Sequence, residues 1–204
     1  LHAAQRREAI DNQDDAQTDK VLDALARNNT WQVPTLALLT GSTERPFESK
    51  EWISTFEYLP DGVATRFKEG VEQYRKLPVS DNSKKFTQWG YKMTKKIHDK
   101  GIGLMAGTDC PIFFLTPGRS LHEELSEFAK AGITTLEILK AATLRPAEYF
   151  NMQDELGLIK EGYHADLVIL NDNPLDDIRN TMKIDAIIKA GTYHIRDKLM
   201  DKLK

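Results

Sequence analysis

Apolar residues recur at helical spacing in several separate segments of the chain. The clearest is residues 15–28, DAQTDKVLDALARN, in which Val21, Leu22 and Leu25 fall on one face. The same spacing predicts helices over 61–77, 83–100, 121–132 and 134–146, and a short helix over 146–151. Ser120, followed three residues later by Glu123, predicts a capping box that starts the 121–132 helix.

Two apolar segments between these helices predict buried β-strands. The first is TWQVPTLALLT at 30–40, and it should end near Val33 because Pro34 has no backbone N–H for a central strand. The second is GIGLMAGTD at 101–109. Strands that alternate with helices of ten or more residues are typical of parallel βα units, so the fold class is expected to be α/β.

The rest of the chain departs from this alternation in two places. Residues 41–82 are irregular but rich in aromatic side chains, which indicates a lid over another part of the molecule. Residues 156–170 and 186–195 predict two hairpins that turn at Gly162 and at Gly191–Thr192. A small antiparallel sheet is therefore expected at the carboxyl end.

Composition excludes several classes of function. The 204 residues carry 28 Lys and Arg against 31 Asp and Glu, so the net charge of −3 gives no electrostatic case for binding nucleic acid or an anionic membrane. No apolar run approaches the roughly 20 residues of a membrane span. The single cysteine, Cys110, excludes an internal disulfide and a zinc site built from cysteines. Residues 1–10 show neither an initiator Met nor a signal-peptide pattern, so we expect a longer parent protein.

Asp109 is the strongest candidate for chemistry. It directly follows the apolar segment LMAGT, and in βα barrels the catalytic residues lie at the carboxyl ends of strands. A carboxylate there can bind a divalent metal and accept a proton from water. The local pattern alone also fits an aspartate that merely caps the strand end.

The five histidines do not form a metal motif by themselves. They are His2, His98, His122, His164 and His194, and no HxH or HExxH spacing occurs among them. His122 begins the helix that follows Asp109, so it could lie near the substrate. A capping or surface role for His122 is the alternative.

The order of the motifs provides a further guide. GLMAGTD at 103–109, PGRSLHEELSEFAKAGIT at 117–134 and LEILKAATLRPAEYF at 136–150 resemble the carboxyl-terminal half of the amidohydrolase superfamily. LGLIKEGYHADLVILNDNPLDDI at 156–178 and AIIKAG at 186–191 continue the resemblance in the same order. The likeness is to its imidazolonepropionase-like and prolidase-like members in particular.

This resemblance implies part of a metal-dependent (β/α)8 TIM barrel with a flanking β-sandwich. Residues 1–152 would carry barrel strands seven and eight, and residues 153–204 would belong to the sandwich. Asp109 would be both a metal ligand and the general base in hydrolysis of a C–N bond, in a cyclic amide or a dipeptide-like substrate. The expected cofactor is one or two divalent metals, with zinc the leading candidate. The expected partners are a small-molecule substrate and no nucleic acid or membrane.

The family's other metal ligands have no match in this sequence. Its strand-one His-x-His, its bridging lysine or glutamate and the histidines of strands five and six are missing, and His2 lies too far along the barrel to be assigned. We therefore expect a fragment that is inactive by itself and that pairs with the rest of the protein or with itself, because half a barrel leaves strand edges open. The alternative is a non-catalytic relative that keeps the fold as a scaffold.

Overall fold

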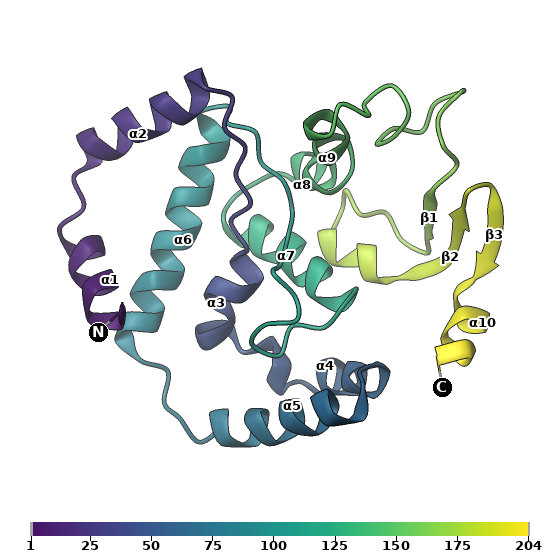
Figure 1. Cartoon of the computed structure of the whole chain (residues 1–204), viewed down its shortest axis with the longest axis horizontal. Coiled ribbons are helices and arrows are strands. Elements are labelled where there is room, and N and C mark those ends of the chain that lie inside the picture. Colours follow the sequence, from purple (N-terminus) through teal and green to yellow (C-terminus); the bar gives the residue numbers. More distant parts are fainter. Residues whose placement is uncertain (1, 204) are drawn as a thin grey trace.

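The computed structural model describes residues 2–203 and contains a helical region followed by a small sheet (Figure 1). The α-helices are α1 His2–Asp11, α2 Asp15–Arg27, α3 Leu36–Glu44, α4 Lys50–Ile53, α5 Asp61–Tyr74, α6 Asp81–Asp99, α7 Arg119–Lys130, α8 Thr135–Ala142, α9 Leu144–Tyr149 and α10 Arg196–Met200. The 3-10 helices are η1 Pro46–Glu48, η2 Ser54–Tyr58, η3 Ile178–Met182 and η4 Asp201–Leu203, and the strands are β1 Leu167–Leu170, β2 Ile184–Lys189 and β3 Thr192–Ile195.

The helices predicted from apolar spacing are confirmed, although the break between the last two falls at Thr143 and not at Pro146. Three of them, α2, α6 and α8, start at a side-chain cap. Ser80 accepts a hydrogen bond from the N–H of Ser83 at the start of α6, and Thr134 does the same for Glu137 at the start of α8. The predicted capping box at Ser120 is wrong. Helix α7 starts after Gly118, whose φ of 78° suits a residue without a Cβ, and Ser120 lies buried inside the first turn.

The two predicted barrel strands lie side by side in parallel but form only one bridge. Gln32 pairs with Leu104, the N–H of Gln32 donates to the carbonyl of Gly103 at 2.8 Å, and the N–H of Met105 donates to the carbonyl of Gln32 at 3.0 Å. The first segment was expected to end near Val33, and the structure agrees, because Thr35 turns the chain at a φ of 50° and α3 begins at Leu36. Within residues 2–203 neither segment has a second neighbouring strand to extend the ladder.

The aromatic segment between α3 and α5 is well packed. Phe47, Trp52 and Phe56 are each at most 2% exposed, and with Val71 and Leu115 they form one core cluster. A second cluster joins α3, α7 and α8. This segment therefore packs against the loop that follows Asp109, and its role as a lid stays a prediction.

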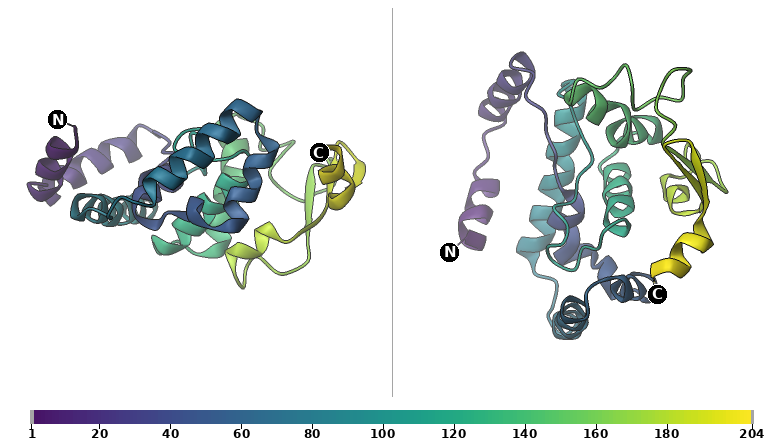
Figure 2. Two further views of the ribbon diagram at one scale, coloured as in Figure 1. Left: turned by 90° about the horizontal axis from the view of Figure 1, so that it is seen from below. Right: turned by 45° about the vertical axis from the view of Figure 1, so that its right-hand side comes forward.

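The carboxyl-terminal sheet has the antiparallel order β1-β2-β3 and lies on the side of the molecule away from α1 and α2 (Figures 1 and 2). The second predicted hairpin is confirmed, with Lys189 paired to Thr192 and the turn at Ala190–Gly191, one residue earlier than expected. The first predicted hairpin is wrong, since only residues 167–170 of it form a strand.

The structure is thus α/β, and a complete barrel or sandwich is not contained in the described residues. The domain boundary between residues 152 and 153 stays a prediction. None of the described helices combines the length and the apolar character that crossing a membrane requires.

Candidate active site

Asp109 ends the segment that pairs with Gln32. Its φ is 57°, in the left-handed region, and its carbonyl accepts a hydrogen bond from the N–H of Ile112 at 3.4 Å. The residue is exposed, while Leu104 in the same segment is only 6% exposed. The preceding Thr108 is fixed to α7, because its hydroxyl lies 3.2 Å from that of Ser120. The chain therefore leaves the core at Asp109 and presents a carboxylate beyond it.

Cys110, next to Asp109, does not have the surroundings of a nucleophile. Burial raises the pKa of its thiol, which outweighs the lowering effect of a hydrogen bond with Ser120. Its Sγ also donates to the carbonyl of Leu115 at 3.4 Å. These contacts favour a packed thiol over a reactive thiolate.

His122 lies on α7 and reaches toward the tail of the chain. Its Nδ1 is 2.9 Å from the hydroxyl of Thr181 in η3, and burial, together with the nearby Arg119, lowers the pKa of the imidazole. The structure records no contact between His122 and Asp109 among the described residues. The role of His122 near the substrate stays a prediction, and this contact favours its structural alternative.

The ligands of a whole metal centre are not brought together by this chain. Within residues 2–203 no three His, Cys, Asp or Glu side chains lie close enough to hold an ion. The exposed Asp109 carboxylate has no ion-pair partner in that range, so its chemistry fits one position around a divalent metal. A complete centre needs ligands from outside these residues.

Two fully buried carboxylates on α7 escaped the sequence analysis. Glu124 accepts a hydrogen bond from the N–H of Ala37 at 2.7 Å, and Glu127 accepts one from the hydroxyl of Tyr91 at 2.6 Å. The Nζ of Lys130 also lies 2.7 Å from Glu127. The signal that could have found Glu124 is its spacing of four residues before the buried Phe128, which puts both on the apolar face of α7.

Comparison with known proteins identifies the class to which this arrangement belongs. Residues 72–193 match the model of the amidohydrolase family, and the chain belongs to that family. The resemblance to amidohydrolases seen in the sequence is therefore confirmed at the level of the family. The match does not specifically show the narrower likeness to imidazolonepropionases.

Individual proteins also resemble this chain over part of their length. Ochratoxinase from Aspergillus niger is 39% identical over 82 residues, which are 39% of this chain and 16% of the ochratoxinase. Bottromycin amidohydrolase superposes with a TM-score of 0.66 at 21% identity, over 85% of this chain and 38% of that one. A putative prolidase from Bifidobacterium longum gives a TM-score of 0.57 at 26% identity, over 85% and 39%. The chain thus spans less than two fifths of the length of these proteins.

Proposed function

We propose that the intact protein hydrolyses a C–N bond in a small amide or dipeptide-like substrate, with Asp109 as a metal ligand and general base. The observation that carries this proposal is the exposed Asp109 carboxylate at the carboxyl end of an apolar segment, inside the region that matches the amidohydrolase family. That end of a strand is where βα-barrel enzymes place their catalytic side chains.

The separate roles of the metal and of Asp109 follow from the chemistry of each group. A divalent metal, with zinc the leading candidate, polarises the amide carbonyl and lowers the pKa of water when it is bound. The Asp109 carboxylate would hold this metal and take a proton from the attacking water. An aspartate suits both tasks because it stays ionised beside a cation and can still accept a proton.

The substrate class is supported by the names of the relatives. One solved structure that resembles this chain is a Xaa-Pro dipeptidase with bound methionine, with a TM-score of 0.61 at 20% identity over 86% of this chain and 37% of that one. Its likeness supports the fold, and the 39% identity to ochratoxinase supports hydrolase chemistry. From these two likenesses we infer that the intact protein acts on a C–N bond in a small molecule.

The proposal assigns residues 1–152 to the last part of a (β/α)8 barrel and residues 153–204 to a β-sandwich. The remaining metal ligands then come from outside this chain. The 204-residue chain by itself should neither hold metal tightly nor hydrolyse amides, and its open edges should pair with the rest of the protein or with a second copy.

The test measures metal content and hydrolysis of an amide and dipeptide panel by the intact protein, with Asp109→Asn beside it. We expect bound divalent metal, turnover of at least one substrate, and loss of that turnover in the variant. Asp154→Asn is the control, because Asp154 is an exposed loop carboxylate, and it should keep full activity. Full activity of Asp109→Asn contradicts its assigned role. An intact protein without metal or turnover favours the non-catalytic scaffold.

A further inference from the structure

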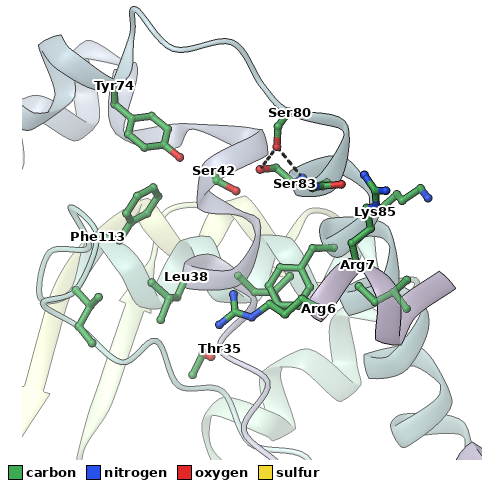
Figure 3. Close-up of a pocket in the computed structure, with 15 residues that line it drawn as sticks. Arg6, Arg7, Thr35, Leu38, Ser42, Tyr74, Ser80, Ser83, Lys85 and Phe113 are labelled. Atoms are coloured by element: carbon green, nitrogen blue, oxygen red, sulfur yellow. Dashed lines mark hydrogen bonds between the residues drawn. The ribbon is translucent and has the colours of Figure 1, made fainter. Parts of the chain in front are cut away.

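A cavity of about 570 Å³ lies between α1, α3, the start of α6 and the loop after Asp109 (Figure 3). Its volume is within the usual range for small-molecule sites. Thr35 lines it at the end of the Gln32 segment, and Ile112 lines it three residues after Asp109. The cavity therefore opens at the same ends of the two parallel segments as the Asp109 carboxylate.

One part of the lining is cationic. Arg6, Arg7 and Lys85 all contribute to it, and none of its fifteen residues is an aspartate or glutamate. Asp11, which lies outside the lining, pairs with Lys85 at 2.6 Å and with Arg7 at 3.9 Å. These two cations are therefore partly neutralised.

Arg6 is differently placed. Its guanidinium lies 5.1 Å from the ring centroid of Phe86, and no carboxylate lies within ion-pair distance of it among the described residues. Stacking on a ring holds the guanidinium plane and leaves its N–H groups at the edge to donate. Arg6 thus presents unpaired donors beside the cavity.

The opposite part of the lining is apolar. Figure 3 shows Leu38 and Phe113 on one side of the cavity and Arg7 and Lys85 on the other. Phe113 is held in place by rings, with Tyr74 at 5.1 Å and Phe47 at 5.5 Å between centroids. Ser42, Ser80 and Ser83 also line the cavity, and the hydroxyls of Ser80 and Ser83 lie 3.0 Å from each other.

We propose that this cavity binds an organic carboxylate with a compact apolar body. The carboxylate would accept hydrogen bonds from the Arg6 guanidinium, and the body would pack against Leu38 and Phe113. A guanidinium matches the planar carboxylate, and the apolar wall gives a reason to prefer an organic acid over an inorganic anion. This binding does not depend on the proposed hydrolysis, because none of its residues is a candidate metal ligand.

The test is calorimetric titration of the intact protein with phenylpropanoate, after a chelator has removed bound metal. The neutral phenylpropanol and the small anion acetate serve as comparison ligands. We expect phenylpropanoate to bind more tightly than either one. Raising the salt concentration from roughly 0.05 to 0.5 M should weaken the binding of phenylpropanoate, because salt screens a charged contact. The affinity for phenylpropanol should stay unchanged.

Arg6→Gln is the matching variant. It should lower the affinity for phenylpropanoate by about tenfold or more, as expected for the loss of one charge-assisted contact. Arg66→Gln removes the same charge from the exposed face of α5, outside the lining, and should change affinity less than about twofold. Equal loss in the two variants, equal binding of the acid and the alcohol, or no binding of the acid at millimolar concentration overturns the proposal. Amide hydrolysis can fail while this binding holds, so the two proposals are judged separately.

Discussion

The carboxylate of Glu124 in α7 accepts a 2.7 Å hydrogen bond from the backbone N–H of Ala37 in the first turn of α3. Thr35, the N-cap residue of α3, makes no side-chain cap of its own. A helix needs acceptors for its first N–H groups, and here a carboxylate from 87 residues further along the chain supplies one. Glu124 thereby holds together the segments that follow Gln32 and Asp109.

The pKa of the Glu124 carboxyl group is shifted in the folded protein. Burial raises the pKa of Glu124 to about 8, against the lowering effect of the N–H groups of Ala37 and Leu36. Its second oxygen, Oε1, is buried without a partner, which fits a protonated carboxyl. The folded state therefore keeps a proton on Glu124 that the unfolded chain releases near pH 4.5.

Stability should fall as pH rises from about 4.5 to about 8, because only the folded state binds the proton in that window. Glu124→Gln keeps the acceptor for Ala37 and cannot ionise, so it should flatten this slope, a difference on the order of a few kcal/mol at pH 9. Urea unfolding of the intact wild-type protein and of Glu124→Gln from pH 5 to pH 9 measures the two slopes. Glu69→Gln, at an exposed position on α5, should leave the slope unchanged. Identical slopes in both variants contradict the assignment.

The backbone of Asp109 predicts a ranking of substitutions that is separate from its chemistry. At a φ of 57°, asparagine is among the side chains best tolerated, whereas alanine pays a strain of about 1 kcal/mol. Both Asp109→Asn and Asp109→Ala should lose turnover, and only Asp109→Ala should lose stability. Thermal unfolding of the two intact variants measures this. Equal melting temperatures would show that the turn relaxes around the residue.

The sequence predicted the helices well because their determinants are local. Apolar positions in α2, α5 and α6 fall on one face, and caps such as Ser80 lie within three residues of the N–H groups they serve. Asp109 was found for the same reason, since an apolar run that ends in a carboxylate is visible in the chain itself.

The errors arose where the outcome depends on distant neighbours. The segments at 30–40 and 101–109 carry strand-like residues, but within the described chain each has one neighbour, and the ladder shrinks to a bridge. Glu124 gave no sign of being neutral, because its burial depends on α3 packing against α7. The cavity beside Arg6 likewise exists only once α1 and α3 are brought together.

Two glycines provide a matched test of the contact between the parallel segments. A Cβ on Gly103 would lie 2.5 Å from Cδ2 and Cε3 of the Trp31 ring, which itself packs edge-on against Tyr149 at 5.8 Å. Gly103→Ala must displace this ring and should destabilise the protein by about 1–3 kcal/mol. Gly62→Ala meets nothing within 4 Å in α5 and should stabilise it by up to roughly 1 kcal/mol. Denaturant unfolding of the intact variants gives both values, and a neutral Gly103→Ala would mean that the ring moves freely.

Trp52 connects the aromatic segment to the loop after Asp109. Its side chain is fully buried, its Nε1–H donates to the carbonyl of Phe114 at 2.9 Å, and the Arg119 guanidinium lies 5.4 Å from its ring centroid. Trp52→Phe keeps most of the apolar contact and removes the donor. The Phe114 carbonyl then loses its partner, so we expect a loss of about 1–3 kcal/mol.

Trp89→Phe is the control for this prediction. Trp89 also donates its indole N–H, at 2.8 Å to the side chain of Gln13, but this partner is only half-buried and can turn to water. The same change should therefore cost less than about 1 kcal/mol at Trp89. Urea unfolding of both intact variants compares the costs, and amide turnover shows whether loosening the Trp52 contact also disturbs Asp109. If the two losses are equal, the carbonyl of Phe114 finds another donor, and the segment is not held to the loop by this bond.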